Sequence, residues 1–369
     1  MCEAAADSRL VPAGVKRHCR RCFVLGAGFS KGCGLPLAGE LTALIYRALR
    51  QRDPTDISAD APLAQHTDFG YEAFQESYEA ARLLFPGFEC SFASDRTWPD
   101  FEELISALDE ARQYQSSFER VTATAARNWA ENTKRSLLYV LENRLGQLTE
   151  IAPAEGLDVI REFVRRIDQS RDSVVSFNWD VLLEIAAADL GVTVSYNGAQ
   201  GNLAVAKPHG SFNLVDSPKD KYDEARGTTL NVPSLDIEME YRAAEARVVL
   251  RAQDAQQARL LLGWAEAPLI VEPNIRKLYD NPWIEFQWAR ALQMVRSADE
   301  LFVIGFSLPP ADIRPRLLMQ LSRLPRPGRP PKLILIDPNA TNLAIHYRRL
   351  TGLEAEPFTG TLRDWLANS

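Results

Sequence analysis

Short apolar runs rich in β-branched residues recur along the chain, and segments with helical periodicity separate most of them. The two densest runs are Glu300–Ile304 and Lys332–Ile336. Runs of this kind are typical of strands that are buried on both faces of a parallel sheet. The alternation with helical segments favours an α/β fold with a Rossmann-like doubly wound, mainly parallel sheet. The other predicted strands are about 21–26, Val174–Phe177, Val192–Ser195, Leu203–Lys207 and Pro268–Val271.

The spacing of the strands divides the chain into two parts. The first strand, followed by a predicted helix at about 36–50, is separated from the others by a long segment with apolar residues at helical spacing. Its cleanest helical pattern is Asn132–Ile151. We therefore predict a nucleotide-binding α/β domain formed by residues 1–50 and 171–369, with a large helical insertion, residues 51–170. The 369 residues suffice for such a domain and its core.

Composition excludes several classes of protein. The net charge of −7 gives no basic field for nucleic acid. No apolar stretch approaches the roughly 20 residues that span a bilayer, and the polar N-terminus has no signal-like segment, so we expect a cytoplasmic protein. Cys19 and Cys22 have metal-site spacing, but a structural zinc needs four ligands and no second such pair exists. We interpret them as two reduced thiols at a strand start.

Three predicted strands end in polar or glycine-rich motifs. Asn178 and Asp180 follow one strand, His209 follows the next, and a glycine-rich turn follows the first. Ligands of open α/β sheets bind outside the carboxyl ends of the strands. We therefore expect these side chains to meet in one crevice. His209 is the only one of four histidines at such a strand end, which favours a functional role over a structural one.

The glycine-rich turn, Gly26-Ala27-Gly28-Phe29-Ser30, lies between a strand and a helix and suits a phosphate. It departs from the dehydrogenase fingerprint, because Lys31 stands in place of the third glycine and no carboxylate follows about 20 residues later. Hydride transfer is therefore disfavoured. A plain tight turn is the alternative reading of these glycines.

Two further strand ends are candidate contacts for a nucleotide. Gly305-Phe306-Ser307 offers backbone and hydroxyl groups to a phosphate or ribose. Pro309 stands where a nucleophile elbow has its second glycine, so a serine hydrolase is disfavoured. Asp337 could accept hydrogen bonds from ribose hydroxyls or act as a helix N-cap. The irregular stretch from Asp216 to about Val232 is compatible with an active-site lid and equally with a surface loop.

Taken in chain order, these motifs resemble the sirtuin-like (SIR2-like) domain, and most closely the bacterial branch that hydrolyses NAD in anti-phage defence. The resemblance runs from about Cys22 to Asp337. The chain lacks the two Cys-x-x-Cys pairs of the zinc ribbon in deacetylating sirtuins, and their Pro-Asp-Phe-Arg run after the glycine motif. Both departures point away from peptide deacylation and towards NAD cleavage. The motifs that carry the resemblance are Gly26-Ala-Gly28-Phe-Ser30, Ser176-Phe-Asn178-Trp-Asp180, Lys207-Pro-His209-Gly210-Ser211 and Gly305-Phe-Ser307-Leu-Pro.

The resemblance implies an NAD+ glycohydrolase that releases nicotinamide and ADP-ribose and needs no metal. Asn178 would contact the nicotinamide-side ribose or place the attacking water, and His209 would act as general base. Asp180 would contact ribose or, as we favour, brace its loop. Asp337 would hold the adenosine ribose. The pyrophosphate would lie between Gly26, Ala27, Gly28 and Ser30 on one side and Gly305 and Ser307 on the other.

The same resemblance implies that the resting protein is inactive and that assembly or a partner activates it. The expected partners are further copies of the chain or a separate sensor, such as an Argonaute-type protein or a HerA-like ATPase. The helical insertion is the candidate gate or assembly surface. Two other functions remain open: an ADP-ribosyltransferase that uses the same site, and a non-catalytic sensor of NAD or ADP-ribose.

Overall fold

A computed structural model defines the parts of the chain that surround the predicted sheet. The structure describes residues 19–37, 40, 103–104, 106–108, 110, 125, 129, 155–196, 203–215, 268–270, 282–309, 312–322 and 330–369. Three predicted features lie almost wholly outside these residues: the helix at 36–50, the helix Asn132–Ile151 and the lid candidate at 216–232.

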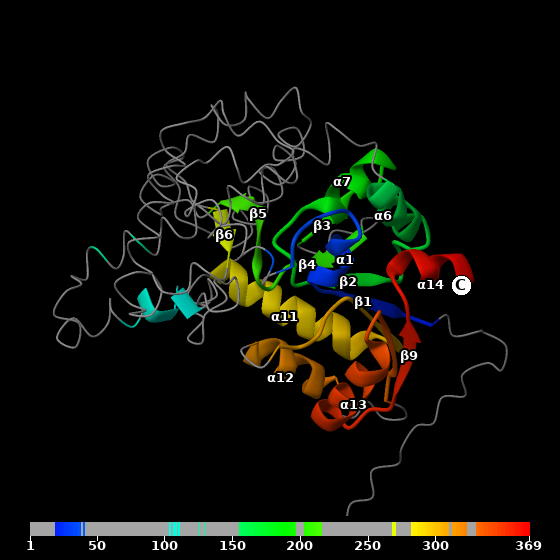
Figure 1. Cartoon of the computed structure of the whole chain (residues 1–369). Coiled ribbons are helices and arrows are strands. Elements are labelled where there is room, and N and C mark those ends of the chain that lie inside the picture. Colours follow the sequence, from blue (N-terminus) through cyan, green and yellow to red (C-terminus); the bar gives the residue numbers. More distant parts are fainter. Residues whose placement is uncertain are drawn as a thin grey trace, which may run out of the picture.

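Seven parallel strands form the main sheet (Figure 1), in the order β3-β4-β2-β1-β7-β8-β9. From the central strand β1 the chain passes to β2 beside it, then to the edge strand β3 and back to β4 between β2 and β3, before it crosses to the other side of β1 with β7. This reversal lies between β1 and β7, and it is where doubly wound sheets bind ligands. The α/β, Rossmann-like, doubly wound fold is thus confirmed. The strands are β1 (Arg21–Leu25), β2 (Ser173–Ser176), β3 (Val194–Ser195), β4 (Leu203–Ala206), β7 (Glu300–Ile304), β8 (Lys332–Asp337) and β9 (Ala355–Thr359).

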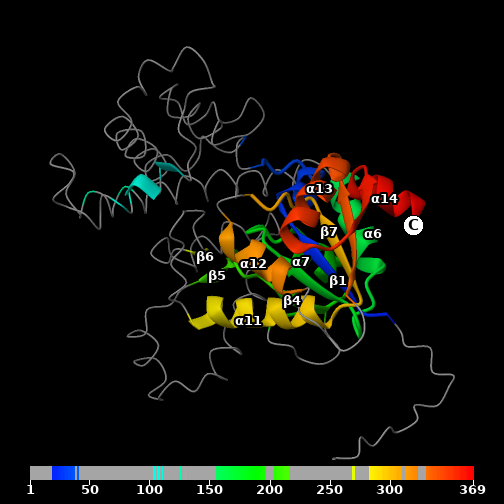
Figure 2. The ribbon, with the colours of Figure 1, turned by 90° about the horizontal axis from the view of Figure 1, so that it is seen from below.

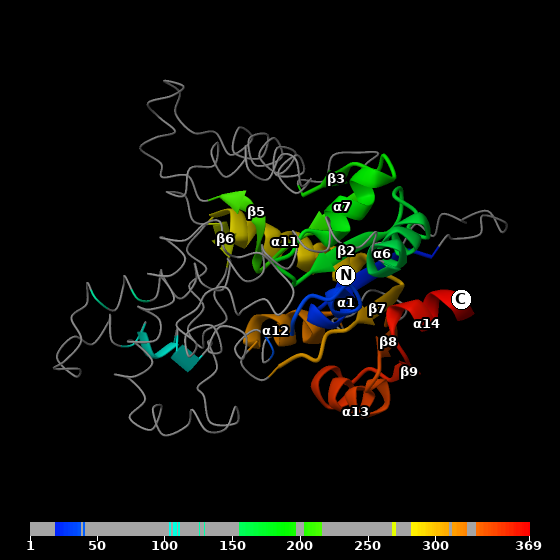
Figure 3. The same cartoon turned by 45° about the horizontal axis from the view of Figure 1, so that its top comes forward.

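Helices cover both faces of the sheet, as the turned views make clear (Figures 2 and 3). On one face α6 (Glu155–Arg165) packs against α7 (Leu182–Asp189) and α14 (Leu362–Asn368). On the other, α12 (Ile313–Leu321) contacts both α11 (Pro282–Ser297) and α13 (Ala340–Thr351). A five-residue helix, α1 (Ala27–Lys31), follows β1 directly. Among the described residues, no helix combines the length and the apolar character needed to cross a membrane.

The core of the sheet domain extends into the range predicted as the insertion. Phe163 of α6 lies edge-on to Phe23 of β1, with ring centroids 5.1 Å apart, and Phe23 also stacks on Phe302 of β7. Phe163 and its neighbour Val164 are buried in the same apolar cluster as the central strands. Residues 155–165 are therefore an integral layer of the sheet domain, although they precede position 171.

Two strands pair outside the main sheet. β5 (Gly210–Val215) and β6 (Pro268–Ile270) form an antiparallel ribbon (Figure 1). The predicted strand at 268–271 is thus confirmed as a strand, but it pairs with β5 and does not join the parallel sheet. Neither β5 nor the edge strand β9 was predicted, because β5 contains Gly210 and Asn213 and β9 contains Pro357.

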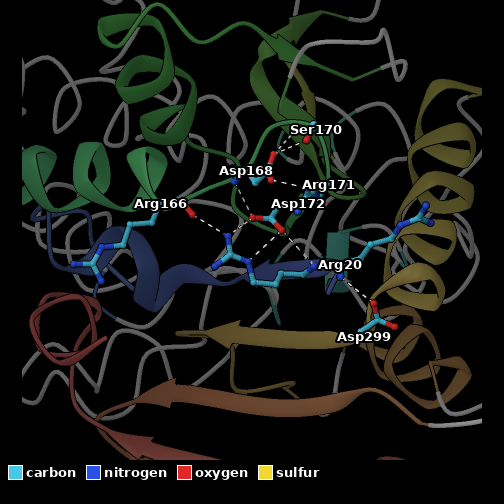
Figure 4. Close-up of polar contacts among 8 residues, drawn as sticks. Arg20, Arg166, Asp168, Ser170, Arg171, Asp172 and Asp299 are labelled. Carbon is cyan, nitrogen blue, oxygen red and sulfur yellow. Dashed lines mark hydrogen bonds and ion pairs between the residues drawn. The ribbon is translucent and has the colours of Figure 1, made fainter. Parts of the chain in front are cut away.

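A polar clamp fixes the amino ends of β1 and β2 (Figure 4). The Asp172 carboxylate is buried, pairs with the Arg21 guanidinium and accepts the Arg21 Nε–H at 3.1 Å. It also accepts the backbone N–H of Asp168 at 2.9 Å. A second Arg21 nitrogen donates to the carbonyl of Arg166 at 2.9 Å. The clamp lies at the opposite end of the strands from the predicted site, so its role is stability.

We expect Asp172→Asn to lower the free energy of unfolding by about 2–3 kcal/mol, because it removes the charge from a buried, multiply bonded carboxylate. Urea denaturation followed by circular dichroism measures this change. The matched control is Asp158→Asn, which removes an ion pair with Arg161 from a carboxylate that is 68% exposed. That control should change stability by less than about 0.5 kcal/mol. Equal effects of the two variants would refute a special role for Asp172.

Candidate functional site

The turns that follow β1 and β7 cross in backbone contact at the reversal point of the sheet. The Gly28 N–H donates to the Gly305 carbonyl at 2.9 Å, and the Gly26 N–H donates to the Ile304 carbonyl at 3.0 Å. Gly305 has φ +60°, and a Cβ there would lie 2.4–2.5 Å from the backbone of Gly28 and Phe29. The backbone amides of Gly26 and Gly28 are therefore hydrogen-bonded within the protein. Ala27 and Gly28 are exposed, so a ligand at this turn would contact these two residues.

Asn178 lies directly over the first glycine turn. Its side-chain Nδ2 donates to the Gly26 carbonyl at 2.9 Å and to Ser30 Oγ at 3.1 Å. A carbonyl can only accept, so the first bond fixes which amide atom is nitrogen. No group among the described residues donates to Asn178 Oδ1. The side chain, which is 8% exposed, can therefore offer a fixed acceptor to a hydroxyl or a water.

Asp180 braces the loop that carries Asn178. Its Oδ2 accepts the Ser30 hydroxyl at 2.7 Å, and its Oδ1 accepts the Leu182 amide at 3.0 Å. Burial raises the pKa of the Asp180 carboxyl, whereas the nearby Lys207 ammonium and these two hydrogen bonds act to lower it. Since both oxygens are occupied within the protein, the contacts favour bracing over a ribose contact. The same network engages the Ser30 hydroxyl between Asp180 and Asn178.

His209 lies on a tight turn between β4 and β5. Gly210, the residue after it, has φ +76° and donates its N–H to the Lys207 carbonyl at 2.9 Å. The Lys207 amide in turn donates to Gln287 Oε1 of α11 at 3.0 Å. These contacts fix the turn at both of its ends and place the imidazole, which is 6% exposed, against an aromatic cluster.

The aromatic cluster joins His209 to the other two motifs. Phe177, next to Asn178, lies edge-on to His209 with centroids 5.0 Å apart and stacks on Phe306 at 4.7 Å. Trp288 of α11 lies 5.9 Å from Phe177 and 5.8 Å from His209. All four rings are buried. Asn178, His209 and Gly305 therefore lie beside one buried aromatic wall, formed by Phe177, Phe306 and Trp288.

The remaining predicted residues extend the same edge of the sheet. Ser307 is exposed just beyond Gly305, and Leu308 next to it has φ +52°, a conformation uncommon for a residue other than glycine. Asp337 ends β8 and accepts the Asn339 amide at 2.7 Å. Helix α13 begins after Asn339, so Asp337 is not its N-cap. Both residues lie along the carboxyl edge, where a nucleotide spanning the reversal point would extend.

A buried tyrosine supports the second glycine turn. Tyr347 of α13 donates its hydroxyl to the Phe306 carbonyl at 2.8 Å. Burial raises the pKa of Tyr347, and the nearby Asp337 carboxylate raises it further, so the phenol stays a neutral donor. The position of Phe306, and with it the aromatic wall, is therefore fixed from α13.

The described thiols are free, and their environments differ. Cys19 is exposed, whereas Cys22 of β1 and Cys33 are buried. Burial raises the pKa of both Cys22 and Cys33 to about 12. In the described part of the chain, no three His, Cys, Asp or Glu side chains gather as metal ligands would.

We expect iodoacetamide at pH 8 to modify Cys19 in the native protein and to leave Cys22 and Cys33 intact, because only thiolates react and a pKa near 12 leaves about one in 10⁴ ionised. Peptide mass spectrometry of the labelled protein measures this. All three should react once the protein is unfolded in guanidinium. Rapid native labelling of Cys22 would contradict its place in the core.

Sequence reasoning missed the residues that support the site. Trp288 and Gln287 come from α11, which is about 80 positions beyond His209 in the chain, and only the fold brings them close. Lys207 belongs to the quoted motif, but nothing in the sequence shows that its ammonium is buried. Glu184 follows Asp180 by four positions, a spacing that could have marked it as a neighbour of that loop at the start of the next helix, α7.

Comparison with known proteins gives a distant structural likeness. No protein-family model matches the chain, and no curated protein matches it. Among solved structures, it is similar to one described as "Structural Basis for the Mechanism and Regulation of Sir2 Enzymes". The identity is 13% and the TM-score 0.35, over 95% of this chain and 91% of that one.

Proposed function

We propose that this protein is an NAD+ glycohydrolase that releases nicotinamide and ADP-ribose, and that it depletes NAD as an effector of bacterial antiviral defence. One observation carries the proposal: Asn178 is hydrogen-bonded to the first glycine turn at the reversal point of the sheet, with His209 across the shared aromatic wall. The ordered motifs that resemble SIR2-like NAD-hydrolysing domains supply the choice of substrate.

The reaction needs little covalent assistance from the protein. Water attacks the anomeric carbon of the nicotinamide-side ribose as the bond to the pyridinium nitrogen breaks, and the bonding electrons neutralise the departing nicotinamide. One proton leaves the water. Because the leaving group is already cationic, the site has mainly to orient the ribose, admit one water and shield the oxocarbenium-like centre. The buried aromatic wall of Phe177, Phe306 and Trp288 serves the last of these roles.

Two side chains have distinct parts in this mechanism. Asn178 Oδ1 accepts a hydrogen bond from the attacking water or a ribose hydroxyl, and its Nδ2 is held by Gly26 and Ser30. His209 takes the proton as general base. Asp180 fixes the loop through Ser30 and Leu182. Ala27, Gly28 and Ser307, which are exposed at the two turns, are the groups proposed to face the pyrophosphate.

The test is to incubate the purified protein with NAD and to quantify nicotinamide and ADP-ribose by chromatography. Equimolar release of both supports hydrolysis. Nicotinamide released with ADP-ribose attached to protein indicates a transferase. Binding of NAD by calorimetry without release indicates a sensor. A series of protein concentrations tests activation by assembly, since turnover per chain should then rise with concentration.

The defence role has its own test. Bacteria that express the chain with its genomic neighbours are infected with phage, and cellular NAD is followed over the course of infection. Depletion that depends on His209 supports the effector role. Unchanged NAD together with unchanged phage yield would argue against it, whatever the purified protein does to NAD.

A further inference from the structure

Lys207 is a fully buried lysine at the root of the turn that carries His209. Its side chain is 1% exposed, although lysine is almost never buried to this extent unless it is paired. It follows β4 directly and precedes Pro208 and His209. The proposed mechanism assigns it no part, so its burial needs a separate explanation.

The ammonium of Lys207 has two partners beyond the end of β2: the Asp180 carbonyl on the loop, and Glu184 on helix α7. It lies 3.3 Å from Glu184 Oε1 and donates a hydrogen bond to the backbone carbonyl of Asp180. Glu184 is 3% exposed, in the first turn of α7, and also accepts the Tyr196 hydroxyl at 2.8 Å. Glu184 therefore compensates the buried charge, and the bond to Asp180 holds a loop.

The main chain of Lys207 is fixed as well. Its N–H donates to Gln287 Oε1, and its carbonyl accepts the Gly210 N–H, which closes the turn around His209. The Gln287 amide nitrogen donates in turn to the Tyr196 carbonyl at 3.2 Å. Lys207 is thus held by α11 and by its own turn, while its side chain reaches α7 and Asp180.

A continuous chain of contacts runs from this lysine to Asn178. The Asp180 carbonyl binds Lys207, and the Asp180 carboxylate binds Ser30. The Ser30 hydroxyl accepts a hydrogen bond from Asn178. Lys207 therefore connects the turn that carries His209 to the loop that carries Asn178, and its length sets their separation.

A buried ion pair is poor at stabilising a fold, because desolvation offsets the attraction and apolar residues of similar volume serve as well. A need for fixed geometry explains the pair better than a need for stability. We propose that Lys207 is a positioning residue, which holds the Asn178–Asp180 loop at the reacting distance from His209, with Glu184 as its counter-ion. This inference rests on the proposed function for its effect on turnover, but not for its effect on the loop.

The experiment compares Lys207→Met, Glu184→Gln and the double variant with the wild-type protein. Lys207→Met should lower kcat about 100-fold, as expected for misplacement of about 1 Å, with KM changed less than about threefold. It should also lower Tm, because Glu184 is left buried and unpaired. The double variant removes that unpaired charge, so Tm should return towards the wild-type value while kcat stays low.

The double variant decides between positioning and mere stability. If kcat recovers together with Tm, Lys207 only supports the fold and the proposal is overturned. The matched control is Lys332→Met, which breaks a Lys–Glu pair with Glu356 across β8 and β9, where both side chains are exposed. This control should leave kcat unchanged. A loss of kcat in the control equal to that of Lys207→Met would also overturn the proposal.

Hydrogen exchange followed by mass spectrometry gives a readout without turnover. Amides of residues 177–182 should exchange faster in the double variant than in the wild type, while those of β1, β7 and β8 keep their protection. Unchanged exchange at 177–182 overturns the positioning role. If the wild-type protein releases no nicotinamide, the proposed function fails, and exchange alone then decides the role of Lys207.

Discussion

Replacing His209 with alanine is expected to lower kcat for nicotinamide release by about 10²–10⁴-fold, the usual contribution of a positioned general base. KM should change little, because the imidazole takes a proton in the transition state and adds little to ground-state binding. The ring packs against both Phe177 and Trp288, so some stability will also be lost. Turnover is measured under conditions where the wild-type protein is active.

Two controls separate the chemistry of His209 from its packing. His209→Gln keeps much of the side-chain volume against the aromatic wall but cannot serve as the base, so it should be as inactive as the alanine variant and more stable. His346→Ala changes a histidine on α13, beside Tyr347 and outside the aromatic wall, and should retain full activity. An active His209→Gln variant would exclude general-base catalysis by this residue.

Gly305→Ala is expected to lower the free energy of unfolding by about 2–5 kcal/mol, the sum of a left-handed backbone cost and an overpacking cost. The new Cβ would lie within 2.5 Å of the Gly28 backbone, which cannot withdraw without breaking its hydrogen bond to Gly305. Thermal and urea unfolding measure the loss. Activity should fall too, because the two turns that cross here form the floor of the site.

The chain offers two glycines that separate the causes. Gly32 has φ −60° and open space around its Cα, so Gly32→Ala should be neutral or stabilise by about 0.5 kcal/mol. Gly191 has φ +70° with open space, so Gly191→Ala should cost about 1 kcal/mol from backbone strain alone. If Gly305→Ala were no worse than Gly191→Ala, the close contact with Gly28 would not exist in solution.

The parallel strands were predictable because strands that are buried on both faces of a sheet are rich in apolar and β-branched residues. β1, β2, β4, β7 and β8 were all predicted within a residue or two of their bounds. β5 and β9 were missed for the opposite reason, since they lie at or outside the edge of the sheet, where glycine and proline are tolerated. α6 was predicted as helical but assigned to the insertion, because periodicity does not show which surface a helix packs on.

For the candidate site, the sequence allowed us to predict only which residues follow the ends of strands. Asn178, His209 and the glycine turns were expected together, and the contacts with Gly26, Phe177 and Phe306 bring them to one edge. The sequence could not show that the Ser30 hydroxyl bonds Asp180, or that the amides of Gly26 and Gly28 bond the second turn. Such use of polar groups within the protein depends on distances that only the fold sets.

The antiparallel ribbon of β5 and β6 joins two distant positions of the chain next to the candidate site. Pairing of Val215 with Pro268 holds these two positions side by side. Since β5 begins at Gly210, directly after His209, the ribbon ties position 268 to the turn that carries this histidine. Any movement of β6 would therefore reach His209 through β5 without passing through the parallel sheet.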